Sequence, residues 1–334
     1  MLFRVTAHSL NSFTSSIPRR KIFATHGPTA KINLSIFGFT QRLPRFLRHR
    51  EAIRPFKLTA RDLEIIRQVA RHRFLSSPQI CCFVEGAAPQ ILRRLQCLFH
   101  AGYLDRPRCQ LDYYHAGGSR PIVYGLASRG AGVLRQKLDL PFSRMDWDTK
   151  PRRVGRIFLE HALMTAGTLI AFEQACRASD RVVNFILPEN VHGSPNVAVS
   201  KHRGWQRWRT ELDGKRQTLI PDAVFVLQYA AEPERTNRRL CFVEADRGTM
   251  PLKRSRGSAS CIERKLRLYT HLWKSGHFSK VSGVNRLQVW IVTESRARAE
   301  HMRQAFALLP AGRGLFHFVT LAELEAPSFS WENL

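Results

Sequence analysis

Three carboxylates, Asp222, Glu244 and Asp246, lie at the ends of two short apolar segments that have the composition of β-strands. The segments are 220–225 and 240–246, and the polar connection between them suits an antiparallel pair. A turn in the middle of this connection places the residue opposite Asp222 near position 246. Glu244 and Asp246 are two residues apart, so they share a sheet face, and we expect Asp222 to lie beside them.

Carboxylates gathered on one face repel one another unless a cation lies between them. Hard divalent ions such as Mg²⁺ and Mn²⁺ prefer oxygen ligands, so Asp222, Glu244 and Asp246 are the candidate ligands of such an ion. Metal-assisted hydrolysis of a phosphodiester requires this kind of arrangement. A simpler interpretation, a turn after Pro221 and a solvated strand edge, fits the two segments equally well.

The charge balance of the chain indicates a polyanionic partner. The 334 residues include 53 Lys and Arg against 26 Asp and Glu, a formal net charge of +27. Release of counterions from neutralised phosphates would supply affinity for nucleic acid, so we expect double-stranded DNA as the partner. A membrane is not expected, because no run approaches the ~18 consecutive apolar residues of a spanning helix.

Cysteine usage and the N-terminal composition indicate a cytoplasmic protein with a basic arm. The seven cysteines include no CxxC pair, which excludes a zinc ribbon, and they fit a reducing compartment. The first 50 residues contain no Asp or Glu, a composition that resembles a transit peptide. We favour a basic, disordered arm over residues 1–56, or translation from an upstream start codon, and expect residues 1–50 to be dispensable for folding.

Residues 57–140 have the layout of a winged helix, with three short helices followed by a hairpin. Thr59 and Asp62 predict a capping box at the first helix, and Gly102 predicts the end of the third, which starts near Ala88. Gly117 and Gly118 mark the hairpin tip. The third helix would enter the DNA major groove, although a solvated helix face is the alternative for each polar residue. The candidate DNA contacts here are Gln90, Arg93, Arg94, Gln96 and, at the wing, Arg120.

After a linker at 141–153, residues 154–325 predict a second domain with a mixed sheet, followed by a tail at 326–334. The order of its elements is α, β, β, β, α, β, α, β. Glu160 interrupts the apolar surface of the long first helix, which makes it a candidate catalytic residue. The alternative is a favourable interaction of Glu160 with the helix dipole.

Basic and aromatic residues alternate before the first carboxylate, and more basic residues follow the last one. Bases could stack on the indoles while the cations bind phosphates. Packing of the tryptophans against the sheet, with the arginines in solvent, is the alternative. The candidate DNA contacts of this group are Arg203, Trp205, Arg207, Trp208, Lys253, Arg254 and Arg256.

Several short motifs together resemble the replication-relaxation family of bacterial plasmids and mobile elements. They are the segment 58–63, the pair Pro221-Asp222, the run Glu244-x-Asp246-Arg247-Gly248-Thr249, and Lys265 with Tyr269, spread over residues 57–310. The resemblance implies an α/β chain in which a winged helix-turn-helix precedes a PD-(D/E)xK restriction-endonuclease-like core of αβββαβ order. It also implies plasmid replication or mobilisation proteins as partners.

The resemblance leaves catalysis open, because a nuclease of this type has Glu-x-Lys on its third strand and this chain has Glu244-x-Asp246. Lys265, on the following helix, could reach back to the same face and replace the missing lysine. Without such a lysine the core would bind DNA without cutting it. None of the thirteen histidines forms His-x-His, so a relaxase is excluded. A transcription regulator is a further alternative, although it has no need for clustered carboxylates. The sequence gives no oligomeric state.

Overall fold

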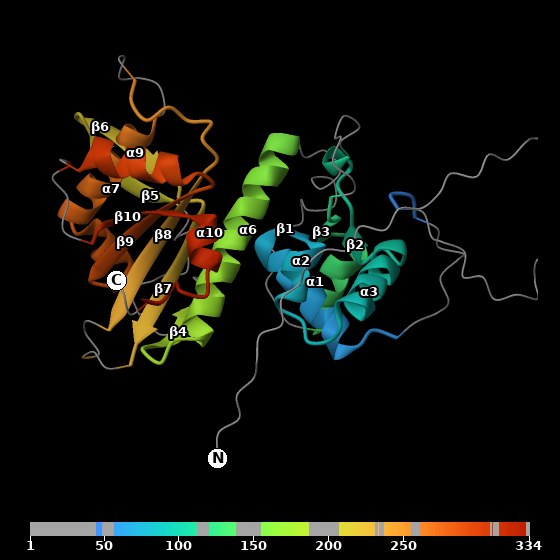
Figure 1. The fold of residues 1–334 in the computed structure, drawn as a ribbon. Helices are drawn as coiled ribbons and strands as arrows, with labels where there is room; N and C mark the ends of the chain where they lie inside the picture. Colours follow the sequence, from blue (N-terminus) through green and yellow to red (C-terminus); the bar gives the residue numbers. More distant parts are fainter. Residues whose placement is uncertain are drawn as a thin grey trace, which may run out of the picture. The chain divides into compact units, whose positions relative to one another are not determined.

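The computed structural model describes a mixed α/β structure built around a mixed five-stranded sheet (Figure 1). The described residues are 45–48, 57–111, 120–137, 155–186, 207–230, 233, 237–254, 261–307, 309 and 314–331. Several predicted features lie outside them, namely the wing tip, the linker at 141–153, Arg203, Trp205 and Arg256.

Helix α1 (Ala60–His72) confirms the predicted start of the N-terminal module, which we define as residues 57–137. The Thr59 hydroxyl accepts a hydrogen bond from the backbone N–H of Asp62, and the Asp62 carboxylate accepts one from the backbone N–H of Thr59 at 2.8 Å. This capping box satisfies two N–H groups that the first turn leaves without helical partners, which stabilises a helix by about 1 kcal/mol.

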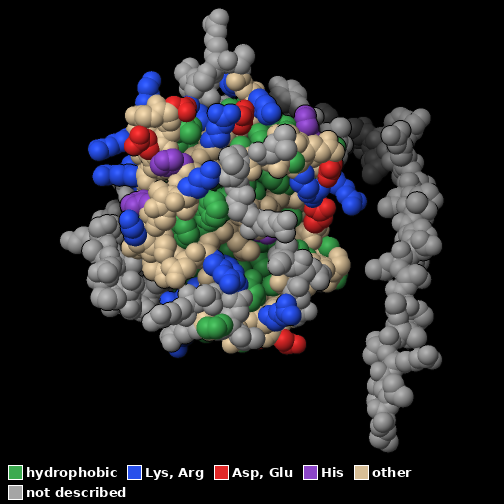
Figure 2. All heavy atoms as spheres, turned by 90° about the vertical axis from the view of Figure 1, so that its left-hand side faces the viewer, with side chains coloured by type: hydrophobic (Ala, Val, Ile, Leu, Met, Phe, Trp, Pro, Cys, Tyr) green, Lys and Arg blue, Asp and Glu red, His purple; other side chains and the backbone are tan. Residues whose placement is uncertain are grey.

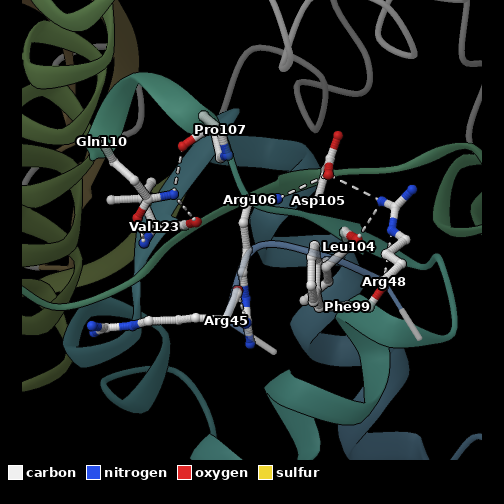
Figure 3. A network of polar contacts seen from close by, with 9 residues as sticks. All are labelled: Arg45, Arg48, Phe99, Leu104, Asp105, Arg106, Pro107, Gln110 and Val123. Carbon is white, nitrogen blue, oxygen red and sulfur yellow. Dashed lines mark hydrogen bonds and ion pairs between the residues drawn. The ribbon is translucent and has the colours of Figure 1, made fainter. Parts of the chain in front are cut away.

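Three short strands accompany the helices of this module and form an antiparallel sheet in the order β1-β3-β2. The first strand of the predicted hairpin, β2, ends at Asp105, and Pro107 then turns the chain into a 3₁₀ turn, η1. Gln110 ties that turn to β3 through its side chain, which bonds both the N–H and the C=O of Val123 (Figure 3). The elements are β1 (Phe74–Ser76), α2 (Ser77–Cys81), α3 (Ala88–His100), β2 (Leu104–Asp105), η1 (Arg108–Gln110), β3 (Val123–Leu126) and α4 (Ser128–Lys137).

Helix α3 has the predicted bounds and the predicted glycine at its end. Gly102 adopts a φ of +81°, and its N–H and that of Tyr103 donate to the carbonyls of Phe99 and Leu98. This pair of bonds is a Schellman motif. Leu92 is 45 % exposed, because it lies one residue beyond the buried stripe that starts at Ile91.

Residues 45–48, predicted to belong to the arm, lie against the C-terminal end of α3 (Figure 3). The Arg48 guanidinium donates to the carbonyls of Phe99 and Leu104 and to the Asp105 carboxylate, at 3.0–3.1 Å. A cation is favourable at this negative end of the helix dipole. Contacts with the fold therefore begin before residue 57, and the dispensability of residues 1–50 for folding stays a prediction.

The five-stranded sheet of the C-terminal module, which we define as residues 155–331, has the order β10-β9-β8-β7-β4. The pairs β8–β9 and β9–β10 are parallel, whereas β7–β8 and β4–β7 are antiparallel, so the predicted mixed sheet is confirmed. The strands are β4 (Val182–Ile186), β7 (Ala223–Tyr229), β8 (Arg238–Asp246), β9 (Arg286–Thr293) and β10 (Phe316–Thr320).

Helices cover both faces of this sheet, as alternating strand residues show. Val224 and Phe242 face α7 and α9, whereas Phe225 and Val243 face α6 and α10. Trp331, from the predicted tail, is 2 % exposed and stacks on Phe172 of α6. The remaining elements are α6 (Arg156–Arg177), α7 (Ile262–Lys274), α8 (His277–Ser282), α9 (Arg296–Phe306), α10 (Leu321–Glu325) and a ribbon of β5 (Trp208–Leu212) and β6 (Lys215–Leu219).

Helix α6 also belongs to the core of the N-terminal module. Ala166 and Ile170 are buried among the apolar residues of that module, and Gln79 donates to the carbonyl of Leu163 at 3.0 Å. Accordingly, residues 43–334 form one compact unit. None of the described helices, α6 included, is both long and apolar enough to cross a membrane.

Candidate functional site

The register of β7 with β8 decides which carboxylates meet. Ala223 pairs with Val243, so the residue opposite Asp222 is Glu244, two positions before the predicted one. A shift of two keeps both carboxylates on the same face, because strand side chains alternate with a period of two. Asp222 is fixed there by the N–H of Ala245, which donates to its carboxylate at 2.8 Å.

Helix α7 places two hydrogen-bond donors over Glu244. Lys265 Nζ lies 2.6 Å from Glu244 Oε2, and the Tyr269 hydroxyl donates to Oε1 at 2.6 Å. The two donors are one helical turn apart, and burial of Leu266 against the sheet sets the rotation that points both at the strand. The structure thus brings Lys265 to the carboxylate face, where the sequence predicts it.

Helix α6 brings His161, and not Glu160, to these carboxylates. His161 Nε2 lies 3.0 Å from Asp222 Oδ1. Neighbouring helix positions point about 100° apart, so only one of the two side chains can face Asp222. The sequence contains both candidates but no pattern that chooses between them. Five residues therefore form one polar group, here called the Glu244 centre: His161, Asp222, Glu244, Lys265 and Tyr269.

Asp246 has a different partner from the other two carboxylates. Arg298 of α9 binds it with two bonds, Nε to Oδ2 at 2.5 Å and Nη2 to Oδ1 at 3.1 Å. The sequence alone predicts that a metal ion offsets the repulsion among the three carboxylates. In the structure each carboxylate has a basic side chain as partner: Asp222 has His161, Glu244 has Lys265, and Asp246 has Arg298. The metal ion stays a prediction.

Burial and neighbouring charges shift the pKa values of the centre in opposite directions. Burial raises the pKa of Glu244 to about 7, against the opposing effects of Lys265 and Tyr269. Burial would also raise the pKa of Asp222, but its bond from His161 and the charges of His161 and Lys265 lower it. The Asp222 bond in turn raises the pKa of His161. Asp222 is therefore held ionised, whereas Glu244 holds its proton more tightly than an ordinary glutamate.

The described residues contain no group of three or more His, Cys, Asp and Glu side chains that could hold a metal ion. Of the predicted ligands, Asp222 and Glu244 are oxygen donors that suit Mg²⁺ or Mn²⁺. Their oxygens already accept bonds from His161, Lys265 and Tyr269. A metal at this place would have to replace at least one of these partners.

The candidate DNA contacts of α3 differ in their availability. Gln90 and Arg93 are exposed and Gln96 is half-buried. Arg94 is held by Asp62, with Nε bonded to Oδ1 at 3.0 Å and Nη2 bonded to Oδ2. Arg120, which the sequence assigns to the predicted wing, is also exposed. The solvent-facing side of α3 therefore presents Gln90 and Arg93, while Arg94 links α3 to α1.

In the basic and aromatic segment, Trp208 fits the packing alternative. It is 1 % exposed and its ring lies 5.0 Å from that of Phe242, so it is not available for stacking on a base. Arg207 beside it is exposed, as are Lys253 and Arg254. On the face of the C-terminal module shown in Figure 2, Lys and Arg side chains are spread widely and not gathered into one patch.

One comparison with known proteins gives a match. A protein-family model described as Replication-relaxation matches residues 66–287, a range that includes α3 and the whole Glu244 centre. No curated protein and no solved structure matches the chain.

Proposed function

The chain belongs to the replication-relaxation family, whose model matches well over half of its 334 residues, and on this premise we propose that it binds duplex DNA. The family name suggests a role in the replication or relaxation of plasmids or other mobile elements. Binding would serve that role, with other replication or mobilisation proteins as partners.

The N-terminal module supports docking by a winged helix. Three helices, α1, α2 and α3, precede two antiparallel strands, β2 and β3, and residues 106–122 connect those strands at the place of a wing. In winged-helix proteins the helix before the hairpin enters the major groove.

The observation that carries the proposal is the division of α3 into two faces. Ile91, Leu95 and Leu98 are fully buried, whereas Gln90 and Arg93 are exposed. Arg and Gln are the side chains that make bidentate contacts to guanine and adenine in the major groove. The Asp62–Arg94 pair anchors this helix to α1, so its exposed face is held in one orientation.

Binding is tested with the full chain, because α6 supplies part of the core of the N-terminal module. We expect the logarithm of the affinity for duplex DNA to fall linearly with log salt, with a slope of about −0.9 per phosphate contact. Arg93→Ala should weaken binding, whereas Arg135→Ala, an exposed arginine of α4, is the control. An absence of binding at low salt would contradict the proposal.

For the C-terminal module we propose a PD-(D/E)xK-like core that holds DNA without cutting it. The order α6, β4, β7, β8, α7, β9 and the places of Asp222 and Glu244 on adjacent strands support the core. Pairing of each carboxylate with a protein cation supports the absence of cleavage, since no metal is needed to relieve their repulsion.

Metal-dependent nicking is the second candidate function, and the position of Lys265 favours it. Asp222 and Glu244 would hold Mg²⁺ or Mn²⁺, which would act as a Lewis acid on the phosphodiester. Lys265 lies 2.6 Å from Glu244, where its charge could offset the charge that develops on the phosphate. Incubation of supercoiled plasmid with the full chain and either metal decides between the candidates, because only the second produces the open circle.

A further inference from the structure

We propose that Glu160 holds two arginines in a binding site for phosphates of the DNA backbone. The arginines are Arg156 and Arg247, and we call the three residues the arginine cluster. The inference rests on the proposed DNA binding and adds the place where the backbone would meet the C-terminal module.

Both arginines bond the Glu160 carboxylate directly. Arg156 Nε donates to Oε1 at 2.8 Å, and Arg247 Nη2 donates to Oε2. Arg247 is fixed a second time, since its Nη1 donates to the carbonyl of Ile157 at 3.2 Å. The bond from Arg156 lowers the pKa of Glu160, and the charges of Arg247 and Arg120 contribute to this shift.

The cluster carries more positive charge than Glu160 can neutralise. Two guanidinium groups bonded to one carboxylate leave an excess of one positive charge. The cluster is partly open to solvent, with the side chains of Arg156, Glu160 and Arg247 exposed by 48 %, 30 % and 19 %. Arginine presents a planar fork of N–H donors that matches phosphate oxygens, and neutralised phosphates release counterions.

Helix stability does not account for this arrangement. Arg156 is the first residue of α6, where the positive end of the helix dipole disfavours a cation. An arginine that precedes its glutamate by four residues is also the weaker orientation of such a pair. A structural role would need only one cation at Glu160, whereas the chain supplies two, from the start of α6 and from the segment after β8.

The position of the cluster gives it a function in placing DNA. Glu160 precedes His161, and Arg247 follows Asp246, so the cluster adjoins the Glu244 centre. A DNA backbone bound at these arginines would lie next to the carboxylates, and the cluster would set the register of the duplex at the centre.

The test measures duplex affinity of the full chain over a range of salt concentrations. Arg156→Ala and Arg247→Ala should each make the slope of log affinity against log salt shallower by about 0.9. The affinity ratio of wild type to variant should therefore fall about threefold to fourfold as the salt rises from 50 to 200 mM. Arg177→Ala is the matched control, because Arg177 also bonds a glutamate of α6, Glu173 at 2.8 Å, but at the opposite end of the helix. It should leave the slope unchanged.

A fourth variant, Glu160→Gln, separates a phosphate site from a salt bridge. It should raise affinity for DNA, because it removes the anion that competes for the arginines. A fall in melting temperature with unchanged affinity would instead mean that the cluster only stabilises the fold. Should Arg247→Ala fail to fold, Arg156→Ala and Glu160→Gln still give the answer.

The outcomes also separate this inference from the proposed function. If Arg156→Ala and Arg247→Ala keep the salt slope of the wild type while Arg93→Ala binds more weakly, the inference is overturned and the proposed DNA binding stands. Failure of the wild-type chain to bind duplex DNA would overturn both.

Discussion

The two modules each contain a buried acid bonded to a base and a hydroxyl, and the two acids behave differently. In the N-terminal module Asp62 bonds Arg94 and the Thr59 hydroxyl. In the C-terminal module Glu244 bonds Lys265 and the Tyr269 hydroxyl. Asp62 is fully buried and Glu244 is 5 % exposed, so burial penalises the charge of each acid.

Their surroundings decide the direction of the pKa shift. Burial would raise the pKa of Asp62, but two bonds from the Arg94 fork and two from Thr59 outweigh it, and the pKa is lowered. Lys265 offers Glu244 a single point charge, and Asp222 adds a like charge nearby, so burial prevails and the pKa rises to about 7. A carboxylate that its hydrogen-bond donors keep ionised serves to link parts of the structure. A carboxylate whose pKa is raised beside a like charge is instead typical of functional sites.

The largest expected effect on stability comes from the loss of the Asp62–Arg94 pair, which links α1 to α3. Asp62→Ala removes the partner of Arg94 and the capping box of α1, and should destabilise the protein by about 3 kcal/mol, the range for breaking a buried pair. Arg67→Ala, which breaks the exposed pair with Glu64, is the control and should cost less than about 1 kcal/mol. Urea denaturation measures both, and equal losses would show that Asp62 is not a link.

The next largest expected effect concerns Lys265, the cation beside Glu244, and the rate of plasmid nicking. If the chain nicks plasmid, Lys265→Ala should reduce the rate by about 10² or more, because it removes the cation beside Glu244. Lys274→Ala, an exposed lysine at the end of the same helix, should leave the rate unchanged. Equal nicking by wild type and Lys265→Ala would remove Lys265 from the site, and no nicking by wild type would leave the non-cleaving core.

A smaller effect tests Asp222, for which the structure reverses the expectation from sequence. Repulsion among three carboxylates would make Asp222→Asn neutral or stabilising without metal. The bond with His161 lowers the pKa of Asp222, so the ionised form stabilises the fold. Asp222→Asn should therefore destabilise the metal-free protein by about 1–2 kcal/mol. The loss should largely disappear in a His161→Ala background, and a double-mutant cycle in EDTA measures it.

The pH dependence of stability should have opposite signs for the two acids. The pKa of Asp62 is lowered from 3.8, so its contribution is present above pH 3.8 and is lost as the pH falls through the folded value. The pKa of Glu244 is raised from 4.5 to about 7, so its contribution is present below pH 4.5 and is lost as the pH rises through about 7. Unfolding free energies of Asp62→Asn and Glu244→Gln across this range, each compared with wild type, test the signs. The same sign for both would mean that the two acids do not differ.

The sequence correctly predicts the structural features that depend on local interactions. The capping box of Thr59 and Asp62, the Gly102 end of α3 and the order of strands and helices around the sheet follow from residues a few positions apart. Lys265 was also placed correctly, because the helical spacing of Leu266 and Tyr269 fixes which side of α7 faces the sheet.

The tertiary structure alone decided which side chains far apart in the sequence contact one another. The register that sets Glu244 opposite Asp222, the choice of His161 over Glu160, and the pairing of Asp246 with Arg298 each depend on how separate elements dock. A shift of two in register, or a rotation of α6 by one residue, leaves the local pattern of apolar and polar residues acceptable, so the sequence pattern does not separate these alternatives. The sequence thus determined which reactive side chains the protein carries, and the packing of its helices and strands decided which of these side chains are in contact.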